Sequence, residues 1–220
     1  PEVIGQGKQA ISGYADTLEG PTRPLNEIRM LLLGDGAAGK TSIVRALLGK
    51  PFDADSETTH GINVDDWAVT LPGGEDLTTH IWDFGGQEIM HATHQFFLSE
   101  RSLYLVVLDG RKDEKAEDWL KYVKTFGEDS PVFVVLNKQD EHGGYEVNNK
   151  SLRRDYPNIA GFFKVSCKDP NASDGIDALR TAIRQQMKEM EMRRAKFAEN
   201  WLAVQSDIES LDKDYIPGAS

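Results

Sequence analysis

The sequence predicts a three-layer α/β domain, in which helices cover both faces of a six-stranded sheet that is parallel except for one antiparallel strand. From residue 28 onward, short apolar runs alternate with amphipathic stretches, a pattern typical of parallel strands joined by crossover helices. Turn-forming residues at 71–76 (Leu-Pro-Gly-Gly-Glu-Asp) separate two of these runs, which indicates an antiparallel hairpin. One hairpin combined with parallel strands indicates a mixed sheet rather than a fully parallel one.

The predicted elements follow one another along the chain. The last helix is the clearest, because its apolar residues recur every three or four positions, at Ile176, Leu179, Ile183 and Met187. The expected helices are residues 40–48, 115–126 and 175–190. The expected strands are residues 28–33, 62–70, 77–84, 103–109, 132–137 and 162–166.

Both ends of the chain differ from this pattern. Residues 3–18 have helical spacing and are followed by a Gly/Pro-rich segment at 20–24, which predicts a connector helix and linker over residues 1–24. Beyond a charged stretch, a new helical pattern begins at Trp201. We therefore expect the α/β domain to span residues 25–195 and a separate segment to occupy residues 196–220.

The composition limits the kinds of partner. Hydrophobic residues make up 39% and charged residues 28% of the chain, as in an ordinary soluble globular protein. The net charge is −11, from 36 acidic and 25 basic residues, and repels nucleic acid and anionic membranes over most of the surface. No nucleic-acid partner is therefore expected, and any phosphate must be held by a local site.

Cysteine content and hydropathy predict the compartment. The single cysteine, Cys167, excludes an internal disulfide and fits a reducing environment, so we expect a cytoplasmic protein. No apolar run reaches the ~18 residues of a membrane span, and neither a signal peptide nor a prenylation motif is visible, so no direct membrane anchor is expected. Because the chain starts at Pro1, we expect it to be a piece of a longer protein.

A phosphate-binding loop is predicted between the first strand and the first helix. Its sequence, Gly-Asp-Gly-Ala-Ala-Gly-Lys-Thr, matches the pattern GxxxxGK[ST]. Backbone N–H groups would converge on a phosphate at the positive end of the helix dipole, while Lys40 bridges the β- and γ-phosphates and Thr41 binds Mg²⁺. A plain glycine-rich turn, the alternative, does not explain the flanking strand and helix. The residues expected to bind the nucleotide here are Gly34, Asp35, Gly36, Ala37, Ala38, Gly39, Lys40, Thr41 and Ser42.

A second motif ends the strand candidate 77–84, where Asp-Phe-Gly-Gly-Gln matches DxxG followed by glutamine. Asp83 is expected to hold Mg²⁺ through water, the Gly86 N–H to contact the γ-phosphate, and Gln87 to orient the attacking water. On its own this string would be a plain turn. Its position after the phosphate-binding loop favours the functional interpretation.

Two threonines lie between these motifs. Thr59 is the better candidate for a switch residue, because its spacing to Gly61 and Ile62 fits a Thr-x-Gly-hydrophobic pattern. Its hydroxyl would join Mg²⁺ and its N–H would reach the γ-phosphate. Thr58 remains the alternative.

A base-reading motif, Asn-Lys-Gln-Asp, follows the apolar run at 132–136. The Asp140 carboxylate can accept hydrogen bonds from the N1–H and N2–H₂ groups of guanine, and adenine lacks this donor pair. Asn137 is expected to brace the phosphate-binding loop and the stem of Lys138 to lie over the base. The motif therefore predicts selection of guanine.

The tripeptide Ser166-Cys167-Lys168 follows the last strand candidate. The backbone N–H of Cys167 is expected to donate to guanine O6, and Lys168 to cover the other face of the base. The Cys167 side chain itself is expected to be a small packed group rather than a nucleophile.

These five motifs, in this order over residues 28–190, resemble those of the Ras-like small GTPase superfamily, whose members have the P-loop NTPase fold. Three segments are most similar to the Roc (Ras of complex) domain of bacterial Roco proteins. They are Thr-His-Gly-Ile-Asn-Val at 59–64, Trp-Asp-Phe-Gly-Gly-Gln-Glu-Ile-Met-His at 82–91 and His-Gln-Phe-Phe at 94–97. The connector at 1–24 is similar to the segment after a leucine-rich repeat array, and residues 196–220 to the start of a COR domain.

The resemblance implies binding and Mg²⁺-dependent hydrolysis of GTP to GDP, coupled as a conformational switch to the leucine-rich repeats and COR domain of a multidomain protein. It also implies a homodimer formed through COR. Catalytic roles are expected for Lys40, Thr59 and Gln87, and Mg²⁺ ligation by Thr41, Thr59 and Asp83.

The rate of hydrolysis depends on an added positive charge. No Arg or Lys occurs between Pro51 and Asn63, so this loop cannot supply an arginine finger, and slow intrinsic hydrolysis is expected. Help could come from another chain, a missing domain or Arg101, whose simpler interpretation is a surface residue. His91 and His94 are better interpreted as packing or surface residues than as bases.

Two alternatives stay open at this point. The chain could be a nucleotide-gated interaction module with negligible hydrolysis, although Gln87, Thr59 and Asp83 are all present. An ATPase on the same scaffold is disfavoured by Asp140.

Overall fold

The structure is a computed structural model that describes residues 26–55, 59, 61–85, 102–109, 116–168 and 174–190, and the backbone of 22–24 and 196–198. It divides into two units, residues 26–190 and residues 1–25 with 191–220. In the second unit, β1 (Thr22–Pro24) and β8 (Lys196–Ala198) form a short antiparallel pair. The sequence carries no signal for this pairing, because both strands are only three residues long.

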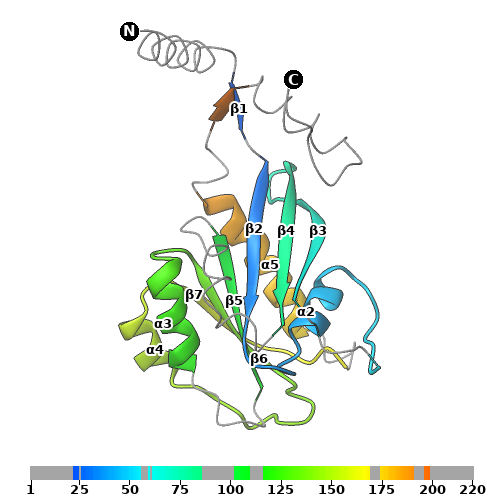
Figure 1. The fold of residues 1–220 in the computed structure, drawn as a ribbon, viewed down its shortest axis with the longest axis vertical. Helices are drawn as coiled ribbons and strands as arrows, with labels where there is room; N and C mark the ends of the chain where they lie inside the picture. The colour runs from blue at the N-terminus through cyan, green and yellow to red at the C-terminus, as the bar shows by residue number, and fades with distance from the viewer. Residues whose placement is uncertain are drawn as a thin grey trace, which may run out of the picture. The chain divides into compact units, whose positions relative to one another are not determined.

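The larger unit combines strands and helices (Figure 1). Its strands are β2 (Glu27–Leu33), β3 (Ile62–Thr70), β4 (Asp76–Phe84), β5 (Ser102–Asp109), β6 (Val132–Asn137) and β7 (Ile159–Lys164). Its helices, within the described residues, are α2 (Lys40–Leu47), α3 (Ala116–Phe126), α4 (Asn149–Asp155) and α5 (Asp174–Glu189).

The six strands form one sheet in the order β3-β4-β2-β5-β6-β7. Strands β3 and β4 are antiparallel and all other neighbouring pairs are parallel, which confirms the predicted fold class. Every residue of β5 and β6 is buried, and these strands therefore read as continuous apolar runs in the sequence. The carboxyl ends of β2, β4, β5 and β6 consequently lie along one edge, where their loops meet.

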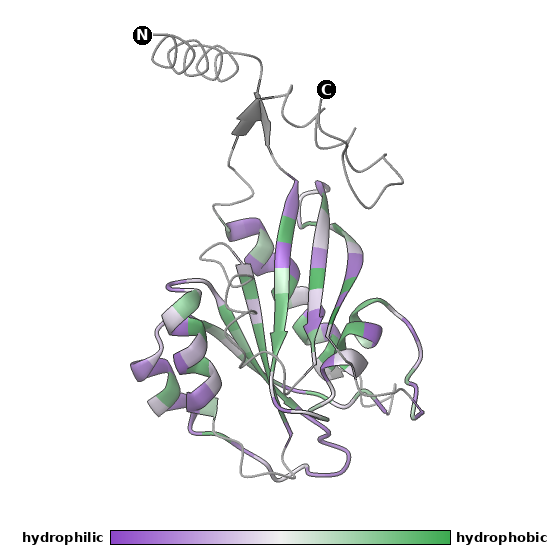
Figure 2. Ribbon diagram, in the orientation of Figure 1, coloured by the Kyte–Doolittle hydropathy of each residue, from purple (hydrophilic) through white to green (hydrophobic). Residues whose placement is uncertain are grey.

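Two hydrophobic clusters fill the two sides of this sheet. Helices α2 and α5 pack on one cluster and helices α3 and α4 on the other. Alternate residues of β2 enter the two clusters, with Leu32 on the first side and Leu31 and Leu33 on the second. Each helix carries hydrophobic and hydrophilic residues along its length, as expected for a helix with one face on the sheet (Figure 2).

Two elements differ from the prediction. Strand β7 covers residues 159–164 rather than 162–166, because Ile159 pairs with Val132, while Val165 and Ser166 already belong to the following loop. Helix α4 was not expected, since it is short and Leu152 is its one buried residue. The one sequence feature that could have predicted this helix is its N-cap residue, Asn148, whose side chain accepts a hydrogen bond from the Ser151 N–H.

Within the described part of the chain, no helix combines the length and hydropathy that crossing a bilayer requires. The connector helix predicted over residues 3–18 and the helical pattern from Trp201 onward lie outside the described residues.

Candidate functional site

The predicted phosphate-binding loop connects the buried strand β2 to helix α2. Gly39 has φ +91°, and a Cβ atom there would lie 2.2 Å from Asn137 Nδ2. A Cβ atom on Gly34 would lie 2.2 Å from the backbone oxygen of Val107 in β5. Glycine is therefore required at both positions, because the loop lies directly against the ends of β5 and β6.

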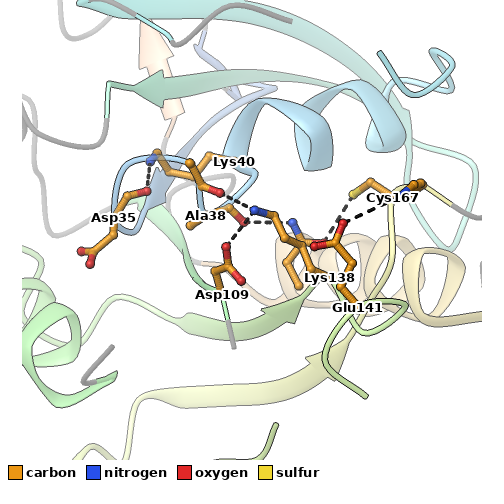
Figure 3. Close-up of polar contacts among 10 residues, drawn as sticks. Asp35, Ala38, Lys40, Asp109, Lys138, Glu141 and Cys167 are labelled. Atoms are coloured by element: carbon orange, nitrogen blue, oxygen red, sulfur yellow. Dashed lines mark hydrogen bonds and ion pairs between the residues drawn. The ribbon is translucent and has the colours of Figure 1, made fainter. Parts of the chain in front are cut away.

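Lys40 is held at the centre of this loop. Its side chain is only 6% exposed, and Nζ donates hydrogen bonds to the backbone oxygens of Gly34 (2.9 Å) and Asp35 (3.0 Å). Figure 3 shows the contact with Asp35. The loop thus folds around an ammonium group. This arrangement presents a localised positive charge where the pattern predicts a phosphate.

The predicted metal ligands lie together beside the loop. Thr41 Oγ1 donates to Asp83 Oδ2 at 2.6 Å, and the hydroxyls of Thr41 and Thr59 are 2.9 Å apart. Thr59 Oγ1 also donates to Asp83 Oδ2 at 3.4 Å. Three segments that are distant in sequence therefore contribute three oxygen-bearing side chains to one point.

Asp83 is 2% exposed, and its burial raises the pKa of the carboxyl group above the usual value, opposed by the Thr41 hydrogen bond and the Lys40 charge. Its Oδ1 atom is buried without a hydrogen-bond partner. Such an orphaned oxygen beside two hydroxyls suits Mg²⁺, which prefers oxygen ligands and typically takes one or two carboxylates plus phosphates and water. The described residues include no group of three His, Cys, Asp or Glu side chains that could hold a metal.

The predicted base-reading loops contact each other and the phosphate-binding loop. Asn137 Nδ2 donates to the Ala38 backbone oxygen at 2.9 Å, which braces the loop as expected. The Gln139 N–H donates to the Val165 backbone oxygen at 3.1 Å and joins the two base-reading loops.

Asp140 and Ser166 form the polar part of this region. Ser166 Oγ donates to Asp140 Oδ1 at 2.6 Å, which orients the carboxylate. Cys167 Sγ lies 3.8 Å from Asn137 Oδ1, and burial, with the Asp140 charge, raises the pKa of its thiol to about 12. The thiol therefore stays protonated at neutral pH, as expected for a packed residue rather than a nucleophile. Lys168 lies 3.8 Å from Glu141 in an exposed ion pair.

One cavity of about 320 Å³ lies beside the phosphate-binding loop. Lys40, Thr41, Thr59 and Lys138 line it, so the structure brings the loop, two of the three predicted metal ligands and one residue of the base-reading motif together. Asp83, Asp140, Ser166 and Cys167 are not among the residues that line it.

Several other residues at this site were not found by sequence reasoning. Phe52 and Glu141 line the cavity, and Trp119 Nε1 donates to Asp35 Oδ1 at 3.2 Å. Phe52 did carry a signal in the sequence, because it is an apolar residue directly before an acidic segment, and the structure leaves it 41% exposed. Trp119 carried none, since its contact with Asp35 links positions far apart in the sequence.

Some predicted residues lie outside the described part of the chain. They are Thr58, Gly86, Gln87, His91, His94 and Arg101. Their roles, and the choice between Thr58 and Thr59, stay predictions.

Comparison with known protein families gives a match over residues 29–140 to the family model described as "Ras of Complex, Roc, domain of DAPkinase". A solved structure of Methanosarcina barkeri Roco2 RocCORdC bound to GDP superposes with a TM-score of 0.82 at 47% identity. That match covers 92% of this chain and 62% of the other.

Curated relatives are much longer than this chain. A Roc-COR-CHAT protease of Runella zeae is 30% identical over 85% of this chain, which spans 22% of its length. A probable serine/threonine-protein kinase, roco5, of Dictyostelium discoideum is 39% identical over 76% of this chain, which spans 8% of its length.

Proposed function

Because the chain belongs to the Roc (Ras of complex) family of Ras-like GTP-binding domains, we propose that it binds GTP and GDP and hydrolyses GTP with Mg²⁺. The observation that carries the proposal is the cavity in which the ammonium-centred loop, the oxygen cluster and Lys138 meet. The similarity to a Roc-COR structure bound to GDP supports the same ligand.

Guanine would be selected by Asp140. A carboxylate can accept two hydrogen bonds side by side, which matches the N1–H and N2–H₂ donors of guanine. The Ser166 hydroxyl at 2.6 Å restricts the rotation of this carboxylate before any ligand arrives. The Cys167 backbone N–H would donate to guanine O6, a contact that does not involve its thiol.

The phosphates would lie on the backbone N–H groups of residues 34–42 at the N-terminus of α2. Lys40 would exchange its backbone partners, Gly34 and Asp35, for β- and γ-phosphate oxygens, which become more negative during the reaction.

Bound Mg²⁺ would neutralise charge on the phosphate oxygens. Thr41 and Thr59 would turn their hydroxyl oxygens toward it, and Asp83 would approach through water. The hydrogen bonds that now join these three side chains hold them within reach of that position.

Hydrolysis would need a positioned water, for which Gln87 is the proposed orienting residue. The described loop at 51–55 contributes Phe52 and Asp53 to the cavity but no cation, so the intrinsic rate should be slow. An arginine from another chain or domain would accelerate it.

Within a longer protein, we place the Roc domain at residues 25–195, a connector at 1–24 and the start of COR at 196–220. Nucleotide-dependent changes near Thr59 and Asp83 would then act on COR, on leucine-rich repeats or on a second protomer, in the cytoplasm. The Roc-COR architecture printed for the similar proteins supports this arrangement.

The direct test is to extract and identify nucleotide from the purified chain and to follow single-turnover GTP hydrolysis with and without Mg²⁺. We expect guanine nucleotides and slow, Mg²⁺-dependent release of phosphate, further slowed in Gln87→Leu. A rate that is undetectable in the wild type and unaltered in the variant would instead favour a nucleotide-gated interaction module.

A further inference from the structure

Asp109 is a buried acid at the edge of the nucleotide site with no part in the proposed reaction. It is the last residue of β5, is 0% exposed, and pairs in register with Asn137 of β6. Its Oδ2 atom accepts a hydrogen bond from Lys138 Nζ at 2.7 Å (Figure 3). A carboxylate buried this deeply is stable in its ionised form only with a charged or well-placed polar partner. Lys138 supplies that partner.

Lys138 is attached at two points. Its Nζ atom also donates to the backbone oxygen of Ala37 in the phosphate-binding loop at 2.6 Å. Its backbone has φ +58°, in the left-handed region that non-glycine residues rarely adopt. The side chain lines the cavity and is 21% exposed, so its stem lies along the wall while its charged end is anchored.

We propose that Asp109 is a positioning residue, which fixes the Lys138 stem as a rigid wall across one face of the guanine base. The inference rests on the proposed function and assigns to it a residue beyond the recognised motifs. A lysine side chain is flexible, and a neutral backbone acceptor holds it less strongly than a carboxylate does. Asp109 therefore reduces the motion that the base would otherwise have to suppress on binding.

The ion pair also predicts an asymmetry between its two partners. Replacing Asp109 by Asn removes the charge and keeps a hydrogen-bond acceptor of the same shape. Replacing Lys138 by Met instead leaves a buried carboxylate without its cation, which is strongly destabilising. Removing both charges relieves that penalty but leaves no anchored lysine beside the base.

The first experiment compares the release of fluorescently labelled GDP from the wild type and Asp109→Asn. We expect release about tenfold faster in the variant, in line with the loss of a charge-assisted hydrogen bond. Glu146→Gln is the matched control, because its carboxylate accepts from Lys164 Nζ at a similar 2.8 Å but in an exposed pair. The control should release GDP at the wild-type rate. Equal rates in all three proteins would overturn the inference.

The second experiment separates positioning from general stability. Melting temperatures of the nucleotide-free protein and GDP release rates are measured for Lys138→Met and for the double variant Asp109→Asn/Lys138→Met. The single variant should melt lower, and the double variant should regain most of that loss, whereas GDP release should stay fast in both. If release slowed to the wild-type rate as the melting temperature recovered, Asp109 would be a structural residue only. A wild type unable to bind GDP would reject the proposed function itself, an outcome distinct from unchanged rates in the variants.

Discussion

Asp140 is the side chain that we propose selects the base. Its Oδ1 atom already accepts a hydrogen bond from Ser166, whose hydroxyl is nearly buried, so the carboxylate is oriented before binding. Preorganisation of this kind reduces the conformational entropy that binding must overcome. Specificity then depends on the hydrogen-bonding pattern of the base rather than on its size.

Changing this carboxylate to an amide should therefore change the preferred base. In Asp140→Asn we expect GDP affinity to fall about a hundredfold, because hydrogen bonds to a charged group contribute ~1.5–3 kcal/mol each. Xanthosine diphosphate, which carries a carbonyl in place of the guanine amino group, should gain affinity, since the Asn side chain can donate to that carbonyl. Competition against fluorescent GDP measures both effects.

The wild-type protein, titrated with the same two nucleotides, is the reference for this test. A variant that still preferred GDP over xanthosine diphosphate would show that Asp140 does not read the base.

At the scale of elements, the loops rather than the strands carry the chemistry. Parallel strands β2, β5 and β6 bring the phosphate-binding loop, Asp109 and Asn137 to one edge of the sheet. The antiparallel hairpin of β3 and β4 brings Asp83 to the same region, with Asn63 as its register partner. Two of these strands, β5 and β6, are buried along their whole length.

Helix α4 contributes no residue to the cavity lining, so a change in its packing tests whether stability and binding are independent. Leu152 is 3% exposed and packs in the cluster under α3. We expect Leu152→Ala to lower the free energy of unfolding by about 2–5 kcal/mol, as in other buried leucine truncations. GDP release should stay within about twofold of the wild type, because α4 contributes no residue to the cavity lining. Chemical denaturation and labelled-GDP release measure the two quantities.

Lys150→Ala, on an exposed position of the same helix, provides the comparison and should change stability by less than about 0.5 kcal/mol. A large change of GDP release in Leu152→Ala would mean that α4 is coupled to the site.

At the scale of the whole domain, the site brings together polar and charged groups that the fold alone would not favour. Asp83 is an acid whose pKa is raised by burial, and its Oδ1 atom has no hydrogen-bond partner. A raised carboxyl pKa means that the charged form is disfavoured in the folded state, so this group reduces stability as the pH rises through that pKa. Bound metal and nucleotide would offset the penalty.

Removing the ligands should therefore destabilise the domain measurably. GDP and Mg²⁺ at about one hundred times the dissociation constant should raise the melting temperature of the wild type by about 5–10 °C. In Asp83→Asn the increment due to Mg²⁺ should largely disappear, while the nucleotide-free variant should melt at or above the wild-type temperature because the buried charge is gone. Thermal unfolding without ligand, with GDP and Mg²⁺, and with GDP and a chelator measures the melting temperature in each state and so the increment due to Mg²⁺. An equal Mg²⁺ increment in both proteins would show that Asp83 is not a metal ligand.

Much of the fold and of the candidate site can be predicted from the sequence. The phosphate-binding loop, the hairpin and the base-reading motif depend on local patterns, in which turn residues follow apolar runs at fixed spacing. The six strands were predicted to within three residues at the ends, and the largest error was in β7, where Ile159 joins the sheet by pairing with a residue of a distant strand. Helix α4 was missed because seven mostly polar residues carry no hydrophobic period.

The candidate chemistry can be predicted from the sequence, because the motifs place charged and hydrogen-bonding groups at the ends of strands that hydrophobicity identifies. Which further residues contact these groups depends on the tertiary structure. The Asp109–Lys138 ion pair and the Trp119–Asp35 hydrogen bond, for example, join residues separated by long stretches of chain. Such contacts follow from the order of the strands in the sheet, which no local pattern encodes.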